Sequence, residues 1–183
     1  MRITKENTTA LFIDFQERLF PAMNEKETLL QNTKMLLRGL NLLGITTAFS
    51  QQYTKGLGET LEELRELVPG FIAIEKTDFS CFGAEEYITF LKQYQSKAVI
   101  LCGIEAHVCV LQTAVDLKEA GFNPIVITDC ITSRTVVSKE SAINRFRFEN
   151  IMTATCESIL FELTRSAKAE EFKAISNLVK IQA

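Results

Sequence analysis

Three residues of different chemistry, Asp14, Lys76 and Cys109, could together hydrolyse a bond at a carbonyl carbon. A cysteine attacks carbonyl carbon as its thiolate, and the start of a helix favours that anion through unpaired N–H groups and the helix dipole. Asp14 could accept the thiol proton and later activate water. Lys76 could hold the carboxylate in place and balance the negative charge that accumulates during acyl transfer. These residue types therefore predict acyl transfer through a thioester.

The position of Cys109 singles it out among the five cysteines. Residues 98–102 form a short apolar run that is typical of a buried parallel strand, and the spacing becomes helical from His107 onward. Cys109 is therefore expected in the first turn of a helix. Its backbone N–H and one from the preceding turn could bind an oxyanion, and each such donor contributes about 3–4 kcal/mol. The remaining thiols are expected to be buried: Cys81, Cys102, Cys130 and Cys156.

Each of the other candidates also has a simpler explanation when taken alone. Asp14 stands where a first strand should end, so it could cap a turn, and Lys76 could be an ordinary solvated lysine after a strand. Phe79 and Phe82 could line a pocket or anchor their loop to the core. Asp129 is expected at the end of a strand over residues 124–128.

Predicted strands and helices alternate along the whole chain, which favours a parallel sheet covered by helices on both faces. In such folds ligands bind beyond the carboxyl ends of the strands. Asp14, Lys76, Cys109 and Asp129 should share that edge, and a polar, glycine-containing loop over residues 51–58 could cover it. The strands are expected over residues 8–15, 45–50, 71–75, 98–102, 124–128 and 151–154, and the helices over residues 24–43, 60–67, 84–95, 107–120, 137–148, 157–164 and 168–181.

Composition narrows the function classes. The chain has 183 residues, a net charge of -3 and no basic cluster, so we expect one domain that binds no nucleic acid. An apolar run of the roughly 20 residues needed for a membrane span is absent, as is a cleavable leader, which predicts a cytoplasmic protein with no membrane partner. Five cysteines without CxxC spacing predict neither a disulfide framework nor a zinc site.

The only histidine, His107, argues against sites built from several imidazoles, so no metal or other cofactor is expected. Residues two apart on a helix face different directions, so His107 is poorly placed to act as the base for Cys109. We expect it to cap the helix or to line the pocket wall.

Residues 10–16, 75–80 and 103–110 resemble the isochorismatase-like cysteine hydrolase family, and the resemblance covers nearly the whole chain. It implies a three-layer α/β/α fold around a six-stranded parallel sheet, with Asp14, Lys76 and Cys109 as the catalytic triad. It also implies a non-proline cis peptide between Ile104 and Glu105, which would make the amides of Glu105 and Cys109 the oxyanion donors. Members of the family are commonly dimers or larger, so a homo-oligomer is expected.

Two departures from the family pattern bear on the substrate. Nicotinamidases in this family bind a metal through an Asp-x-His pattern after the second strand, whereas Gln51, Gln52 and Tyr53 stand here. Isochorismatases proper lack the nucleophilic cysteine. The presence of Cys109 therefore favours hydrolysis of a C–N bond in a small amide-like substrate. A pocket for that substrate is expected among Gln16, Phe20, Gln52, Phe79, Phe82 and His107.

Two other functions stay open. The chain resembles most closely the small isochorismatase domain-containing hydrolases, whose substrates are generally unknown. It could therefore be a scaffold or regulatory protein that keeps the fold and binds partners through its amphipathic surfaces. A redox role for the Cys109 thiol is a weaker alternative, because no spacing of a resolving cysteine is present.

Overall fold

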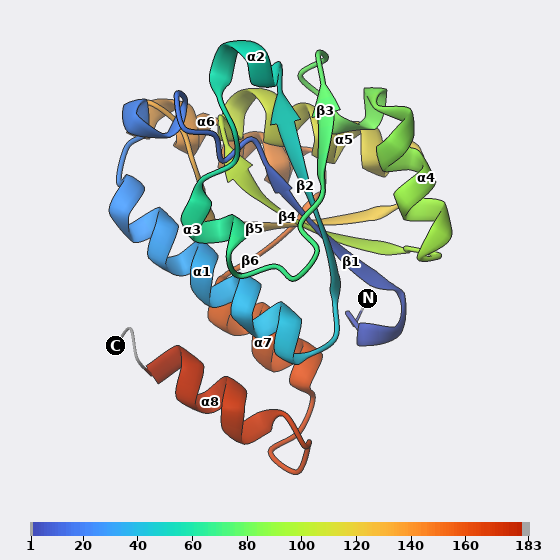
Figure 1. Ribbon diagram of the computed structural model, residues 1–183. Coiled ribbons are helices and arrows are strands. Elements are labelled where there is room, and N and C mark those ends of the chain that lie inside the picture. Colours follow the sequence, from blue (N-terminus) through green and yellow to red (C-terminus); the bar gives the residue numbers. More distant parts are fainter. Residues whose placement is uncertain (1, 181–183) are drawn as a thin grey trace.

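A single parallel sheet of six strands organises the protein, in the order β3-β2-β1-β4-β5-β6 (Figure 1). The computed structural model describes residues 2–180. All six strands lie where the apolar runs predicted them, and the expected doubly wound α/β fold is confirmed. The strands are β1 (Thr8–Ile13), β2 (Thr46–Gln52), β3 (Ala73–Lys76), β4 (Ala98–Ile104), β5 (Asn123–Thr132) and β6 (Met152–Ala154).

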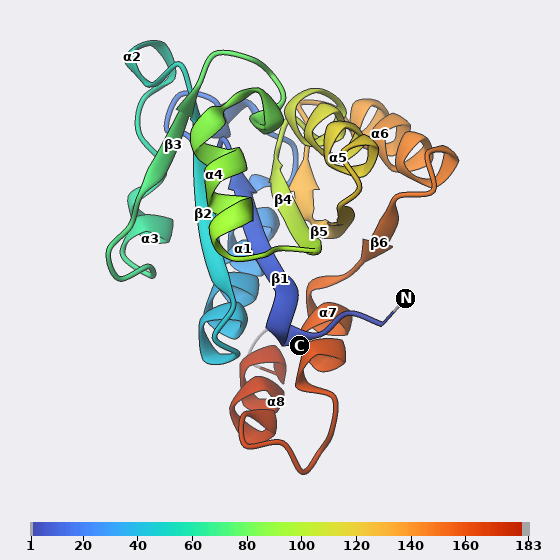
Figure 2. The same ribbon diagram turned by 90° about the vertical axis from the view of Figure 1, so that its right-hand side faces the viewer.

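Helices cover both faces of the sheet (Figure 2). On one face lie α1 and α7, with α8 packed against both of them, and on the other lie α4, α5 and α6. No helix in residues 2–180 is long and apolar enough to cross a membrane. The helices are α1 (Lys26–Leu42), α2 (Thr54–Leu57), α3 (Glu62–Arg65), α4 (Glu85–Gln93), α5 (Leu111–Glu119), α6 (Val136–Phe148), α7 (Cys156–Thr164) and α8 (Phe172–Lys180).

Side chains along β1 show how the sheet divides the core. Phe12 points toward α1 and α7, while its neighbours Leu11 and Ile13 point toward α4 and α5. Successive side chains of a strand face opposite sides, so a strand buried on both faces must be apolar throughout. Every residue of β1 is buried. The apolar runs in the sequence thus place the strand ends, and with them the candidate site, at one edge of the sheet.

Strand β5 differs most from its prediction. It continues to Thr132 because it bulges: Leu101 of β4 pairs with Val126, but Gly103, two residues later, pairs with Ile131. Asp129 therefore lies inside β5, whereas it was expected at the end of the strand. Its Oδ1 accepts a hydrogen bond of 2.8 Å from the N–H of Cys156, so it caps α7. The prediction that Asp129 joins the other three candidates is wrong.

Two helix boundaries also differ. The loop expected over residues 51–58 contains α2, which lies above the carboxyl ends of β2 and β3 in Figure 1. The last helix begins at Phe172 and not at residue 168. Its predicted end at Ile181 lies outside the described residues.

Gly103 allows β4 and β1 to approach each other closely, and we predict that Gly103→Ala is destabilising. A Cβ at this position would lie 2.6 Å from Cβ and 2.7 Å from the carbonyl oxygen of Ile13. Because Ile13 is buried and its backbone has little room to move, the clash should lower the free energy of unfolding by about 1–3 kcal/mol, as measured by urea denaturation. Gly121→Ala is the comparison: φ is +87° there and nothing lies within 4 Å, so its loss comes from backbone strain alone. An unchanged stability of Gly103→Ala would contradict the packing argument.

Candidate active site

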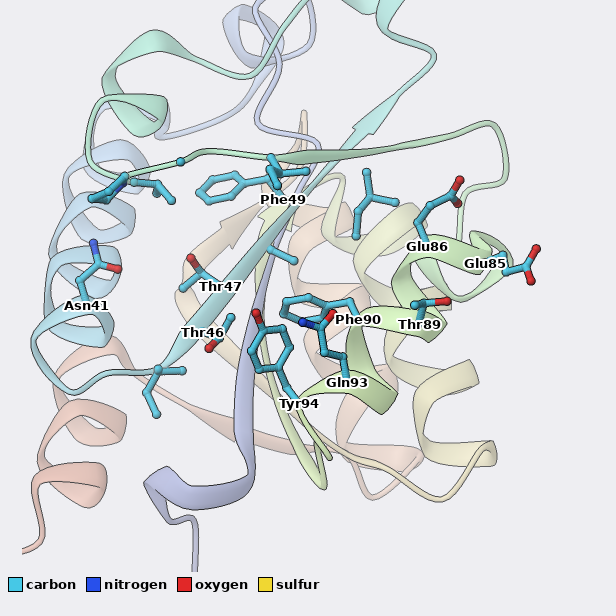
Figure 3. Close-up of a pocket in the computed structure, with 17 residues that line it drawn as sticks. Asn41, Thr46, Thr47, Phe49, Glu85, Glu86, Thr89, Phe90, Gln93 and Tyr94 are labelled. Atoms are coloured by element: carbon cyan, nitrogen blue, oxygen red, sulfur yellow. The ribbon is translucent and has the colours of Figure 1, made fainter.

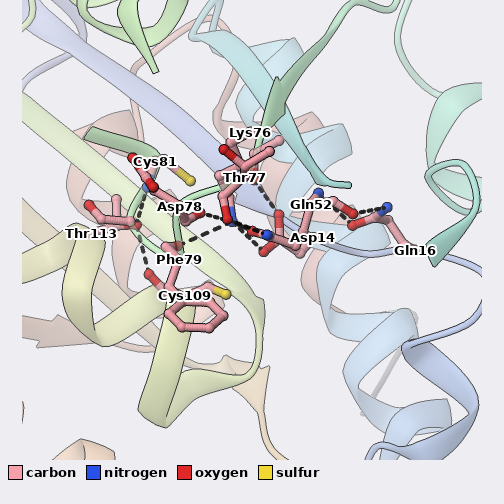
Figure 4. Close-up of polar contacts among 12 residues, drawn as sticks. Asp14, Gln16, Gln52, Lys76, Thr77, Asp78, Phe79, Cys81, Cys109 and Thr113 are labelled. Carbon is pink, nitrogen blue, oxygen red and sulfur yellow. Dashed lines mark hydrogen bonds and ion pairs between the residues drawn. The ribbon is translucent and has the colours of Figure 1, made fainter. Parts of the chain in front are cut away.

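Asp14 and Lys76 form a buried ion pair at the carboxyl edge of the sheet (Figure 4). Asp14 follows directly after β1, and Lys76 is the last residue of β3. The Lys76 Nζ lies 2.8 Å from Oδ2 of Asp14, and the two side chains are 1% and 0% exposed. A buried charge is stable only when it is paired and hydrogen-bonded. The second carboxylate oxygen, Oδ1, accepts a hydrogen bond of 2.8 Å from Ser50 Oγ in β2.

The ammonium of Lys76 has more than one partner. Besides Asp14, it donates to Gln52 Oε1 at 2.7 Å and lies 3.2 Å and 3.1 Å from the carbonyl oxygens of Asp78 and Phe79. Burial alone would lower the pKa of Lys76, but the charges of Asp14, Cys81 and Cys109 outweigh it and leave the pKa above its usual value. Lys76 therefore stays charged at neutral pH.

Two glutamines hold the second strand against this pair. Gln52 uses both ends of its side-chain amide, since Oε1 accepts from Lys76 and Nε2 donates to the Thr77 carbonyl at 2.7 Å. Gln16 is fully buried: its Oε1 accepts from the N–H of Gln52, and its Nε2 donates to the carbonyls of Gln52 and Gly58. The Gln16 amide is thus committed to the chain itself. Both residues therefore connect the segments around the ion pair: Gln52 bonds Lys76 and Thr77, and Gln16 bonds Gln52 and Gly58.

Cys109 lies in a π-helical turn, Ala106–Val110, that leads from β4 into α5. Asp14 and Lys76 both lie near enough to its thiol to change its pKa, so the structure brings all three candidate residues together (Figure 4). Thr113 Oγ1 donates to the Cys109 carbonyl at 2.7 Å and accepts from the N–H of Cys81 at 2.9 Å, which ties the loop after β3 to this turn. Short π-helical segments are frequent at functional sites.

The Cys109 thiol does not rest as the thiolate, although the start of a helix favours that anion. Burial raises its pKa well above that of a free thiol, the charge of Asp14 raises it further, and Lys76 lowers it by less. The residue is only 6% exposed. Cys109 is therefore protonated at neutral pH, because desolvation and a neighbouring carboxylate outweigh the start of a helix.

The turn before Cys109 corrects another expectation. No peptide bond within residues 2–180 is cis, so the cis peptide expected between Ile104 and Glu105 is wrong. The chain turns instead through Glu105 itself, whose φ is +43°. The Glu105 carboxylate bonds Arg134 Nε at 2.7 Å and lies 3.5 Å from His107 Nδ1. His107 Nδ1 also forms a hydrogen bond of 2.9 Å with Ser133 Oγ. This nitrogen is therefore engaged with Ser133 and not with Cys109.

The aromatic residues expected in a substrate pocket have different places. Phe79 is 56% exposed and borders a hollow of about 410 Å³, together with Gln112 one turn after Cys109. Phe82 instead packs edge-on against Phe122, with ring centroids 6.2 Å apart, and anchors the loop. Phe20 is partly buried against the core. Of these aromatic residues, only Phe79 therefore exposes its ring to solvent near the three candidate residues.

A groove of about 780 Å³ lies elsewhere, over the first half of β2 and beside α4 (Figure 3). Its walls include Thr46, Thr47, Phe49, Phe90 and Tyr94. None of the three candidate catalytic residues lines it. The described residues also contain no group of three or more His, Cys, Asp or Glu side chains that could hold a metal ion.

Sequence reasoning missed Ser50 and Thr113. A serine in a strand that also contains two threonines and two glutamines, and a threonine inside a helix, carry no motif, although both are fully or almost fully buried. The partner of Ser50, Asp14, lies 36 residues away in the sequence, so no local pattern pointed to their hydrogen bond.

The buried thiols predict a loss of stability in alkaline solution. Burial raises the pKa of Cys81 from the usual 9.0 to about 11, and it raises the pKa of Cys102 and Cys130 well above 9.0. The folded state then keeps protons that the unfolded chain releases, so the free energy of unfolding should fall as pH rises from 9 toward 11. Urea denaturation across this range measures the fall. Cys81→Ala should reduce its slope, and an unchanged slope would contradict the assignment.

Comparison with known proteins agrees with this fold. The model of the isochorismatase domain family matches residues 8–156. The chain belongs to the isochorismatase family. A relative, isochorismatase domain-containing protein 1 of Salmo salar, is 35% identical over 96% of this chain, which spans 62% of the salmon protein's length. Isochorismatase domain-containing protein 2 of Danio rerio is 32% identical, over 97% of this chain and 89% of the zebrafish protein.

Solved structures of isochorismatase-like proteins share the architecture. MAR1 ribonuclease from Caenorhabditis elegans superposes with a TM-score of 0.93 at 30% identity, covering 98% of this chain and 93% of the nematode chain. The structural neighbours include hydrolases, and membership in the isochorismatase family supports hydrolysis as the class of activity.

Proposed function

We propose that this protein is a metal-independent cysteine hydrolase that cleaves the C–N bond of a small amide-like substrate through a thioester on Cys109. The observation that supports the proposal is the buried cluster in which Asp14 forms an ion pair with Lys76 and lies near enough to the Cys109 thiol to raise its pKa. A nucleophile within hydrogen-bonding reach of a base, with the base oriented by a further group, is the arrangement that covalent catalysis needs.

The raised pKa of Cys109 decides the order of the first step. Because the thiolate does not accumulate, the thiol proton moves to Asp14 as the sulfur attacks the carbonyl carbon, and the oxyanion forms at the same moment. The backbone amide of Cys109 is our candidate for one donor; the Glu105 amide was expected as the second only through a cis peptide between Ile104 and Glu105, and that bond is not cis. The amine then leaves with the proton from Asp14, which leaves a thioester and an ionised carboxylate.

Water completes the cycle. Asp14 takes a proton from water, the resulting nucleophile attacks the thioester, and the sulfur recovers the proton as the acid departs. Throughout, the Lys76 charge compensates the negative charge that moves between Asp14, the sulfur and the oxyanion. The residues expected to contact the substrate are Phe79 at the exposed wall and His107 beside the turn that carries Cys109.

Acylation by p-nitrophenyl acetate tests the proposal without knowledge of the substrate. The native protein should release p-nitrophenolate in a burst and carry one acetyl group, which peptide mass spectrometry should locate on Cys109. The other four thiols are at most 1% exposed, against 6% for Cys109. Acetyl groups spread over all five cysteines, or none at all, would contradict the proposal. A panel of small amides, assayed for released acid and amine, then defines the substrate.

A second candidate is hydrolysis of RNA, which the 30% identity to MAR1 ribonuclease from Caenorhabditis elegans favours. The net charge of -3 opposes it, because RNA binding draws most of its affinity from basic residues. Incubation of single-stranded RNA with the protein and with Cys109→Ser separates the two candidates. Cleavage by the native protein that is lost in the variant would favour the ribonuclease.

Location and assembly complete the proposal. We expect a cytoplasmic homo-oligomer, a dimer or larger, and light scattering of the purified protein measures the number of subunits. A monomer across the micromolar concentration range would contradict this expectation.

A further inference from the structure

Ser50 contacts Asp14 at two points, and the proposed mechanism leaves it without a role. The Ser50 hydroxyl donates to Asp14 Oδ1 at 2.8 Å, and the Ser50 carbonyl accepts from the Asp14 N–H at 3.2 Å. Asp14 has a φ of +55°, a conformation that residues other than glycine seldom adopt. Ser50 is 1% exposed and lies in the middle of the sheet. A rigid strand therefore holds both the backbone and the carboxylate of Asp14.

The two carboxylate oxygens of Asp14 have separate partners. Oδ2 receives the Lys76 ammonium, and Oδ1 receives the Ser50 hydroxyl, which has a single proton to give. That single proton is used by Asp14. The orientation of the carboxylate is thus fixed from β2 through Ser50 and from β3 through Lys76.

We propose that Ser50 is the positioning residue of the general base: its hydroxyl fixes Oδ1 of Asp14 and so holds the carboxylate in the orientation in which it can take the Cys109 proton. This inference rests on the proposed function, in which Asp14 takes the thiol proton. A hydrogen bond to a charged group is stronger than one between neutral groups, so the single Ser50 hydroxyl can set the rotation of the carboxylate. The titratable groups that face Asp14 are Lys76, Cys81 and Cys109.

Loss of the hydroxyl has a consequence that differs from a general weakening of the fold. The carboxylate becomes free to rotate between the Lys76 and Cys109 sides, which slows acylation without changing how the ester binds. Ser50→Ala should therefore lower the maximal acylation rate by p-nitrophenyl acetate about tenfold and leave the half-saturating concentration unchanged.

The experiment compares Ser50→Ala, Ser50→Thr and Ser96→Ala with the native protein. Acylation of Cys109 by p-nitrophenyl acetate is followed at pH 7, and the NMR resonance of the Asp14 carboxyl carbon is recorded at the same pH in all four proteins. In Ser50→Ala we expect the maximal acylation rate to fall and the Asp14 carboxyl resonance to move, because the hydrogen bond to Oδ1 is lost. Ser50→Thr keeps the hydroxyl and should restore both.

Ser96→Ala is the matched control. Ser96 Oγ bonds Thr9 Oγ1 at 2.9 Å in a buried contact at the opposite end of β1 from Asp14, so the same atom is lost without contact with the base. An Asp14 carboxyl resonance that is unchanged in Ser50→Ala, or that moves as far in Ser96→Ala, would overturn the inference. A native protein that is not acetylated on Cys109 would overturn the proposed function, whereas the NMR measurement decides the inference by itself.

Discussion

Asp14→Asn should abolish amide hydrolysis and yet accelerate alkylation of Cys109 by iodoacetamide. Hydrolysis needs the carboxylate to accept the thiol proton, to return it to the amine and to activate water, so we expect a loss of about 10²–10⁴-fold. Alkylation needs only the thiolate. The charge of Asp14 raises the pKa of Cys109 while Lys76 lowers it, so removal of the carboxylate leaves the lysine unopposed. The alkylation rate at pH 8 should then rise about tenfold for each unit by which the pKa falls.

This prediction is informative because the two reactions should change in opposite directions: amide hydrolysis should slow and alkylation should accelerate. A Cys109 thiol whose reactivity depended on activation by Asp14 alone would lose both reactions in the variant, and parallel losses would therefore contradict the assigned electrostatics. Iodoacetamide labelling is measured on Cys109 by peptide mass spectrometry. Cys109→Ser serves as the blank, and thermal melting confirms that Asp14→Asn is folded at the assay temperature.

Lys76→Met should have the largest effect on stability. The substitution leaves the Asp14 carboxylate buried and without its cation, and breaking a buried pair in this way costs about 3–5 kcal/mol of unfolding free energy. Methionine approximates the length of the lysine chain, so little of the loss comes from a cavity. Urea denaturation at pH 7 measures the loss.

A double-mutant cycle separates the charge from the packing. In Asp14→Asn/Lys76→Met no charge of the pair remains, so the double variant should lose less stability than the sum of the two single losses, by 0.5–3 kcal/mol. Simple additivity would show that the 2.8 Å contact contributes no coupling. Ser50 stays in place in all three variants and can donate equally to a carboxylate or to an asparagine oxygen.

The fold was predictable because the sheet is buried on both faces. Such strands are mostly apolar, and the short runs that include Leu11 and Leu101 are typical of them. The bulge of β5 was not predictable, since the register of a strand depends on the neighbour with which it pairs. Asp129 was misplaced for that reason alone.

The candidate site was predictable only as a set of reactive residues. Strand ends identify Asp14 and Lys76, and the strand-to-helix junction identifies Cys109. Their protonation states depend on burial and on distances between segments far apart in the sequence, so the raised pKa of Cys109 had no local signal. Likewise, the hydrogen bonds of Ser50 and Gln52 arise from the parallel pairing of β2 with its neighbours.

The contacts of Lys76 with the loop beside Cys109 affect how the substrate range of the protein can change. Its ammonium bonds the main-chain carbonyls of residues 78 and 79, and every amino acid has that carbonyl. The Phe79 side chain, by contrast, is mostly exposed. Evolution and the protein engineer can therefore exchange the residue at position 79 while the attachment of its backbone is preserved. A saturation library at this position should yield folded variants that differ in substrate preference.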